Sequence, residues 1–264
     1  MTELDLSDFE EYNCHISAYL TKDRLKETAR LVRGPAGLFA RQETGEWLPT
    51  AHPGYSIITP PFGEERDPVN VAAYGALDDV QQALCARLGL VQFAPVPISS
   101  FHLTIASLIS GGEYEERVAG PRERDFRRAV CAVFDGFSAD SVVRMEVQGV
   151  SLFRSGVVVA LAGAEDAAGY RLLLEFRRAV YGDKTLRGFG AAHGHPYTAH
   201  VTLAYVEDTL SFQDRDRLAE TLLAVNERYF AKPLPFNISA AELRKFDGLA
   251  VFYRQGGWPV FRFG

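Results

Sequence analysis

Two short segments of the sequence repeat the same order of residue types around a histidine. They read Ser100-Phe-His102-Leu-Thr104-Ile-Ala106 and Thr198-Ala-His200-Val-Thr202-Leu-Ala204. The two histidines differ by 98 in residue number (200 minus 102), and so do the residues that open the segments (198 minus 100). Because alternate side chains of a β-strand share one face, each segment as a strand presents two hydroxyls and an imidazole on the same side.

These side chains have the chemistry that cleavage of a phosphodiester requires. Histidine has an ordinary pKa of about 6.5, so one neutral ring can accept a proton from the attacking water while a protonated ring donates one to the leaving oxygen. Threonine hydroxyls two residues along can donate hydrogen bonds to the phosphate oxygens. We therefore expect a bell-shaped pH profile with both limbs between about pH 5 and 8. Because the two segments are alike, either histidine can be the base.

The paired His-x-Thr segments resemble those of the two-histidine (2H) phosphoesterase superfamily, which includes the LigT-like RNA cyclic phosphodiesterases. The resemblance covers about residues 55 to 254. It implies catalytic roles for His102 and His200 and phosphate-binding roles for Thr104 and Thr202, with no metal and no other cofactor. It also implies an α+β bilobal fold whose antiparallel sheets line a central cleft, with helices outside. The chain differs from the pattern at Tyr205, where LigT-like proteins often carry an arginine.

Ser100 and Thr198 lie on the same expected faces, so we include them among the substrate-binding candidates. The expected reaction is hydrolysis of a 2′,3′-cyclic or other nucleotide-derived cyclic phosphate. Two alternatives remain: a catalytically silent nucleotide-binding or sensor protein, and a metal-dependent hydrolase that uses His193, His195 and His200. Activity in the presence of a chelator separates the three. His15 and His52 have no partner that the sequence identifies.

The surrounding sequence indicates an internal duplication that would position the two motifs. A strand, a helix and a motif strand are expected at 55–59, 71–88 and 101–107, and again at 157–161, 168–181 and 198–205. Further helices are expected at 21–34, 122–134 and 212–229, and further strands at 142–153, 236–246, 249–254 and 259–263. The opposite face of each motif strand is apolar, ending with Tyr205 in the second, and is expected to pack under helices.

This pattern predicts two compact, pseudo-symmetric lobes that share one interface. The expected ranges are 1–54 for an N-terminal extension of helix and loop, 55–254 for the bilobal domain with motif strands 100–106 and 198–204, and 255–264 for a C-terminal edge segment.

Composition and charge limit the kind of partner. The chain has 264 residues, 47% of them hydrophobic, and a net charge of −6. It shows no basic stripe of the kind that tracks nucleic acid, so we expect a small nucleotide or an RNA end as substrate and no long duplex. The first residues lack the pattern of a signal peptide, no apolar run is long enough to span a membrane, and the three cysteines have no disulfide or metal spacing. These features favour a cytoplasmic protein without a membrane partner, and they leave the oligomeric state open.

Overall fold

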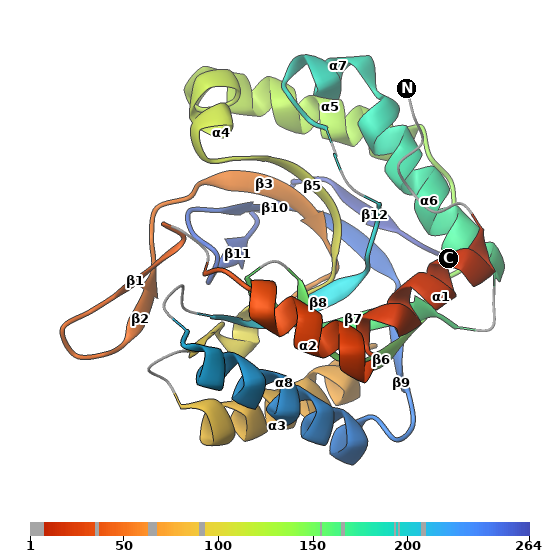
Figure 1. Ribbon diagram of the computed structural model, residues 1–264. Helices are drawn as coiled ribbons and strands as arrows, with labels where there is room; N and C mark the ends of the chain where they lie inside the picture. Colours follow the sequence, from red (N-terminus) through yellow and green to blue (C-terminus); the bar gives the residue numbers. More distant parts are fainter. Residues whose placement is uncertain are drawn as a thin grey trace.

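Two five-stranded antiparallel sheets form the centre of the molecule. The computed structural model describes residues 8–34, 37–62, 68–89, 93–153, 155–164, 167–192, 194, 196–206 and 210–264. The first sheet has the order β11-β10-β3-β5, with β12 also paired to β10, and the second has the order β4-β8-β7-β6-β9. A separate hairpin, β1 and β2, extends from the side of the molecule (Figure 1). The expected α+β class with two antiparallel sheets is confirmed.

The strands of the first sheet are β3 (Gly54–Ile58), β5 (Thr104–Ser110), β10 (Ala240–Phe246), β11 (Phe252–Tyr253) and β12 (Val260–Arg262). Those of the second are β4 (Phe93–Pro95), β6 (Val143–Phe153), β7 (Gly156–Gly163), β8 (His200–Val206) and β9 (Leu234–Ile238). The hairpin consists of β1 (Phe39–Arg41) and β2 (Trp47–Pro49). The α-helices are α1 (Phe9–Tyr19), α2 (Lys22–Leu31), α3 (Val71–Leu88), α4 (Gly111–Arg117), α5 (Glu123–Asp135), α6 (Ala167–Gly182), α7 (Lys184–Gly188) and α8 (Phe212–Tyr229).

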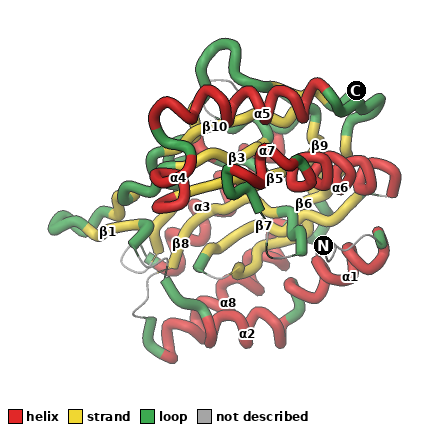
Figure 2. Tube along the Cα trace, turned by 90° about the horizontal axis from the view of Figure 1, so that it is seen from above, coloured by secondary structure: helices red, strands yellow, loops and turns green. Residues whose placement is uncertain are grey.

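The helices form two groups on opposite sides of the sheets. Helices α4 to α7 lie on one side, and α2, α3 and α8 lie on the other (Figures 1 and 2). Helix α3 has the bounds that its apolar stripe predicts, and the stripe is buried at Ala73, Leu77, Val80 and Leu84. At the start of α8, Ser211 and Asp214 form a reciprocal capping box that satisfies backbone N–H groups of the first turn.

The two halves of the sequence are interleaved rather than stacked as two sequential lobes. Strand β4, from the first half, pairs with β8 in the second sheet, whereas β10 to β12, from the C-terminal end, complete the first sheet. Helix α3 follows β3 of the first sheet and packs against α8 and against β4, β8 and β9 of the second sheet. Each sheet therefore depends on strands from both halves of the chain.

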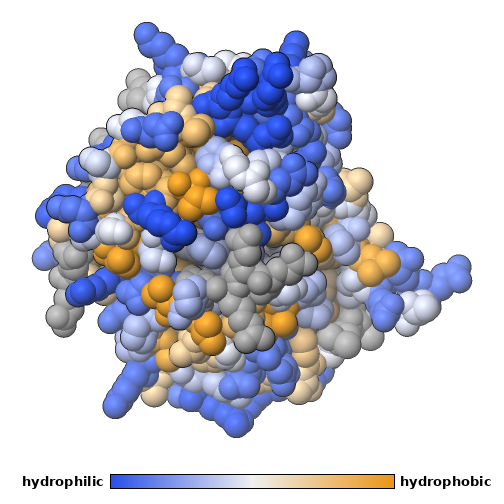
Figure 3. All heavy atoms as spheres, turned by 180° about the vertical axis from the view of Figure 1, so that it is seen from behind, coloured by the Kyte–Doolittle hydropathy of each residue, from blue (hydrophilic) through white to orange (hydrophobic). Residues whose placement is uncertain are grey.

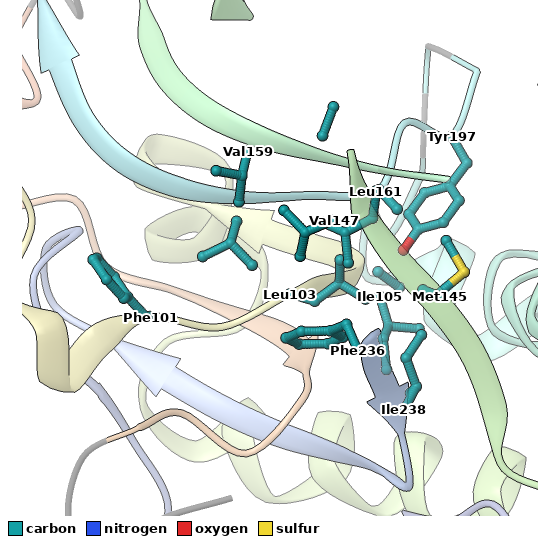
Figure 4. Packing of buried hydrophobic residues seen from close by; sticks show 14 of the residues in the cluster. Phe101, Leu103, Ile105, Met145, Val147, Val159, Leu161, Tyr197, Phe236 and Ile238 are labelled. Atoms are coloured by element: carbon teal, nitrogen blue, oxygen red, sulfur yellow. The ribbon is translucent and has the colours of Figure 1, made fainter. Parts of the chain in front are cut away.

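The apolar faces of the motif segments contribute to a core that the two sheets share. Figure 4 shows Leu103 and Ile105 in one packed cluster with Val147, Val159 and Phe236 of the second sheet. The relative exposure of each of these five residues is 0%. The expectation that these faces pack under helices is therefore wrong for Leu103 and Ile105, because the opposing sheet covers them.

Two expected strand boundaries are also wrong. The run at 236–246 breaks at Ser239, because Ile238 pairs with Val143 in the second sheet and Ala240 pairs with Arg262 in the first. The hairpin expected from 236–246 and 249–254 does form, between β10 and β11, but its loop spans 247–251 rather than two residues.

Hydrophilic atoms predominate on the face shown in Figure 3, interrupted by several separate hydrophobic areas. Large apolar side chains that are exposed come from different elements, such as Leu31 in α2 and Phe212 in α8. None of the helices in the described ranges is long and apolar enough to cross a membrane.

Candidate active site

Both motif histidines line a single pocket of about 240 Å³. Thr104 and Thr202 line the same pocket, as does Ser100. The two motif segments are joined behind the pocket by an antiparallel bridge between Leu103 and Val201. The fold thus brings five of the six candidate residues together.

Thr198 is the exception. It is not among the residues that line this pocket, and its Oγ1 lies 3.4 Å from His15 Nε2 of α1. The motif strands also begin later than expected, at Thr104 and His200 rather than at 100 and 198. In the first motif the chain forms a 3-10 turn over Ile98–Ser100, in which the Ser100 hydroxyl donates to the Pro97 carbonyl at 2.7 Å.

Each histidine is held by the same backbone contact. His102 Nδ1 lies 2.6 Å from the Ser100 carbonyl oxygen, and His200 Nδ1 lies 2.7 Å from the Thr198 carbonyl oxygen. A carbonyl oxygen can only accept, so Nδ1 must carry the proton in both rings. In a neutral ring this leaves Nε2 as the free base, and in a protonated ring Nε2–H becomes the available acid. Both neutral imidazoles are therefore fixed in the Nδ1–H tautomer, and Nε2 is the nitrogen that gains or loses a proton.

Both motif strands contain a β-bulge directly after the threonine. In β5 the pairing with β3 shifts between Ile57 and Ile58, so that Ile105 is the extra residue. In β8 the pairing with β7 shifts between Val157 and Val158, so that Leu203 is the extra residue. A bulge reverses the alternation of the side chains that follow it.

The bulge places Tyr205 in the pocket instead of on the apolar face, where simple alternation puts it. Ser107, 98 positions earlier (205 minus 107), lines the pocket after the equivalent bulge. Burial raises the pKa of Tyr205 to about 12, with the nearby Thr202 hydroxyl acting in the opposite direction. The phenol therefore stays neutral and able to donate a hydrogen bond across the usual range of assays.

The environment favours the neutral form of both histidines in the free protein. The pKa of His102 is lowered to about 4, chiefly by removal from water; the Ser100 carbonyl opposes this change, and the charges of His200 and Arg244 add to it. Removal from water also lowers the pKa of His200, against the Thr198 carbonyl. The positive charge of Arg244 thus acts on the first histidine of the pair.

Aromatic rings pack against both histidines. The Phe252 ring lies 4.2 Å from the His102 ring, and the Phe153 ring lies 5.2 Å from the His200 ring, measured between centroids. Behind Phe252, the buried Arg244 donates to Glu242 Oε2 at 2.8 and 2.6 Å and to the Phe252 carbonyl at 3.2 Å. These contacts restrict the motion of the rings and explain why both are desolvated.

Side chains from the second half of the sequence hold the first motif strand. Strand β5 is an edge strand of its sheet, so part of its backbone has no strand partner. Three side chains donate to its carbonyls, namely Arg177 to Ile105, Tyr181 to Ser107 and Tyr197 to Thr104. The geometry of the first motif therefore depends on α6 and on the residues just before the second motif.

The first helix of the chain supports the second motif. The Tyr12 hydroxyl donates to the Leu161 carbonyl at 2.7 Å and accepts from the Ala199 N–H at 3.2 Å. Tyr12 is fully buried and stacks on Tyr170 with 4.3 Å between ring centroids. A residue from the expected N-terminal extension thus fixes the backbone directly before His200.

Replacing Tyr12 by phenylalanine should lower both stability and turnover. The change leaves a buried carbonyl and a buried N–H without their partner, which costs about 1 to 3 kcal/mol of unfolding free energy. Because the freed N–H directly precedes His200, we expect kcat to fall more than KM changes. Urea unfolding and steady-state kinetics measure the two effects. Tyr229→Phe, which removes a hydroxyl from a half-buried tyrosine at the end of α8, is the control, and equal behaviour of both variants would contradict this role.

A third histidine lines the same pocket, although nothing in the sequence near it indicates a role. His52 Nε2 lies 3.1 Å from Ser110 Oγ, at the far end of β5 from His102. Neither His52 nor Tyr205 was expected at the site. The constant offset of 98 residues is the one signal that could have pointed to the Ser107 and Tyr205 pair.

The alternative metal site would use His193, His195 and His200. His193 and His195 lie outside the described residues. Within the described ranges, no group of three or more His, Cys, Asp or Glu side chains is arranged to hold a metal ion.

No family model and no curated protein match the chain. Among solved structures, the chain is similar to ATU0111 from Agrobacterium tumefaciens str. C58, described as a conserved protein of unknown function. The identity is 20%, the TM-score is 0.57, and 90% of this chain and 96% of that chain are covered. For TT0787 of Thermus thermophilus the identity is 16% and the TM-score is 0.44, and the match covers 73% of this chain and 87% of that chain. For LigT of E. coli in its apo form the identity is 12% and the TM-score is 0.44, and the match covers 81% of this chain and 99% of that chain.

The likeness to ATU0111 extends over nearly the whole of both chains and shows that they share a fold.

Proposed function

We propose that this protein is a cytoplasmic, metal-independent phosphodiesterase that hydrolyses a nucleotide-derived, 2′,3′-cyclic or similar cyclic phosphodiester. The observation that carries the proposal is the matched pair of imidazoles in one pocket, each fixed by a backbone carbonyl so that Nε2 exchanges the proton. Such a pair supplies a base and an acid on either side of a single phosphate. The small pocket, whose lining includes several serine, threonine and tyrosine residues, suits a small nucleotide or an RNA end.

We assign His102 as the general base and His200 as the general acid. When the pair holds one proton, Arg244 disfavours that proton on His102, so it resides on His200. Neutral His102 Nε2 takes a proton from the attacking water as the new P–O bond forms. The ester P–O bond then breaks, and His200 Nε2–H gives its proton to the leaving oxygen, which becomes a hydroxyl.

Thr104 and Thr202 are the proposed donors to the nonbridging phosphate oxygens, and Ser100 lines the same pocket. The Tyr205 hydroxyl adds a neutral donor on the Thr202 side. Hydrogen bonds aimed at oxygens that gain charge in the transition state lower the barrier more than equal binding of the ground state does.

A substrate panel assayed with and without a chelator tests this proposal. The panel contains 2′,3′-cyclic mononucleotides, cyclic dinucleotides, 2′-5′ linked dinucleotides and RNA ends with a cyclic phosphate. We expect hydrolysis of at least one cyclic phosphodiester at an equal rate with the chelator present. Binding without turnover would support a sensor. Activity that is lost with the chelator and restored by zinc or manganese would support a metal site at His193, His195 and His200.

The pH profile should be more acidic than ordinary histidines would give. Because burial lowers both histidine pKa values, the acid form of His200 is lost as the pH rises through a pKa that lies below the ordinary value of about 6.5, and the base form of His102 is lost as the pH falls towards about 4. The profile of kcat/KM should therefore be a bell between about pH 4 and 6.5. A bound phosphate anion favours the imidazolium, so the alkaline limb of kcat should lie above that of kcat/KM. Rate measurements from pH 3.5 to 9 with a chelator present decide the matter, and a plateau that persists to high pH would contradict the acid–base pair.

A further inference from the structure

The carbonyl of the extra residue in each motif bulge accepts a hydrogen bond from a helix side chain. In β8 the Leu203 carbonyl accepts from the Val96 N–H at 3.0 Å and from the Gln81 side-chain amide at 2.6 Å. In β5 the Ile105 carbonyl accepts from the Arg177 guanidinium. Both bulges therefore have a side-chain donor at the residue that makes the strand irregular.

The two donors occupy equivalent positions in the helices that precede the motif strands. Gln81 lies 10 positions after Val71, the first residue of α3 (81 minus 71). Arg177 lies 10 positions after Ala167, the first residue of α6 (177 minus 167). The repeat of the motif segments is thus accompanied by a matched pair of donors, one an amide and the other a guanidinium.

Each donor serves the motif in the other half of the sequence. Helix α3 precedes the first motif but packs against β8, and α6 precedes the second motif but packs against β5. The two helices lie on opposite sides of the sheets (Figure 1). Gln81 therefore reaches the second motif, and Arg177 reaches the first.

Both donors are buried and make further contacts. The exposed fraction is 8% for Gln81 and 4% for Arg177. Gln81 Nε2 also donates to the Val96 carbonyl at 2.8 Å, so the amide has a carbonyl for each of its two N–H groups. The Arg177 guanidinium lies 3.9 Å from the centre of the Tyr197 ring, whose hydroxyl donates to the Thr104 carbonyl at 3.3 Å. Because water has little access, removing either donor from these carbonyls is costly.

The bulges determine which side chains face the pocket. Thr104 and Thr202 directly precede the extra residues, and Ser107 and Tyr205 follow them by two positions; all four line the pocket. Regular pairing without a bulge would turn the residues after it to the opposite face of the sheet. A donor that stabilises the bulge therefore also fixes the direction of the pocket side chains on either side of it.

We propose that Gln81 and Arg177 are reciprocal positioning residues, which fix the bulges after Thr202 and after Thr104, respectively. Neither is among the described residues that line the pocket, so each acts through the backbone of a motif strand. The proposal rests on the proposed function for the catalytic role of the two motifs. The exchange between the halves follows from the hydrogen bonds themselves.

Methionine variants remove the donors and keep most of the side-chain length. We expect Gln81→Met and Arg177→Met each to lower kcat/KM for the preferred cyclic phosphodiester by about 10-fold or more, because small displacements of groups at a reacting centre have large effects on rate. Gln82→Met and Arg171→Met make the same changes at exposed positions of the same helices. These controls should stay within about 2-fold of the wild type.

Threonine variants distinguish positioning from a general loss of stability. The effect of Gln81→Met should be at least about 3-fold smaller in Thr202→Ala protein than in Thr104→Ala protein, since the group that it positions is already gone. Arg177→Met should show the opposite preference. A smaller fraction of folded protein would instead lower the rate by the same factor in both backgrounds. Equal losses in the two backgrounds would overturn the proposal.

If Arg177→Met does not fold, Arg177→Lys takes its place. The ammonium keeps the charge and a donor but lacks the planar guanidinium that contacts both the Ile105 carbonyl and the Tyr197 ring. Its loss of kcat/KM should be smaller than 10-fold and should show the same preference for the first motif. A loss that is equal in the Thr104→Ala and Thr202→Ala backgrounds would again count against the proposal.

Failure of the proposed function gives a different result. If the wild type hydrolyses no cyclic phosphodiester, the NMR signals of the ring Cε1–H groups of the motif histidines, assigned with the His102→Ala and His200→Ala proteins, test the positioning alone. Gln81→Met should shift the His200 signal more than the His102 signal, and Arg177→Met should do the reverse. Shifts with this preference support the exchange without catalysis, and equal shifts or none reject it.

Discussion

Replacing His102 or His200 by alanine is expected to lower kcat by at least about 10²-fold, the scale of lost general acid–base catalysis. Each ring carries out one of the two proton transfers. The hydroxyls of Thr104 and Thr202 cannot take over this role, because they do not gain or lose protons in the pH range where histidine does. The double variant should be far less impaired than the product of the two single losses, because the rings act as a unit. Steady-state kinetics with the preferred cyclic nucleotide measure all three variants.

His193→Ala is the matched control for these two variants. It removes a histidine that only the metal alternative uses, so its kcat should stay near that of the wild type. Circular dichroism and thermal unfolding show that each variant is folded. A folded His102→Ala or His200→Ala protein with nearly normal kcat would reject the paired mechanism, and a large loss in His193→Ala would favour the metal site.

Replacing Arg244 by methionine is expected to cost about 3 to 5 kcal/mol of unfolding free energy. Glu242 and Arg244 are only 6% and 5% exposed, and the variant leaves the carboxylate buried without its cation. Methionine keeps most of the side-chain volume, so the lost ion pair rather than a cavity dominates the effect. Urea unfolding measures the change.

A double variant separates the ion pair from packing. Glu242→Leu together with Arg244→Met removes both charges, and exchange of a whole buried ion pair for apolar groups is often nearly neutral. We expect the double variant to regain most of the lost stability. A single Arg244→Met variant that loses less than about 1 kcal/mol, or a double variant that is less stable than the single one, would contradict this account. Because Arg244 also lowers the pKa of His102, the acid limb of kcat/KM should move to higher pH in the double variant.

Much of the local structure could be predicted because its signals are local. Helix α3 has an uninterrupted apolar stripe and a glycine at its end, and α8 begins at a capping serine. Repetition of the His-x-Thr segments predicted that both threonines and both histidines meet at one pocket, and the structure places them there. Periodicity and capping depend on neighbours within a few residues, which the sequence displays directly.

The positions of Tyr205 and Thr198 could not be predicted in this way. A β-bulge depends on how two strands pair, and a single extra residue at Leu203 moves Tyr205 from the apolar face into the pocket. Thr198 precedes β8, so the alternation of a strand does not apply to it. The role of Tyr12 depends on a hydrogen bond to Ala199, 187 residues along the chain. Such contacts between distant segments leave no periodic signal.

The sharing of strands between the two halves has a consequence for how the chain folds. Strand β3 pairs with β10, so that Ile57 lies opposite Leu243, and the sheet that carries the first motif stays incomplete until almost all of the chain has been synthesised. A fold dominated by such long-range pairs has a high contact order, and loop closure slows its formation. Nascent chains that end before β10 expose an unpaired edge of β3 and are therefore prone to associate with one another.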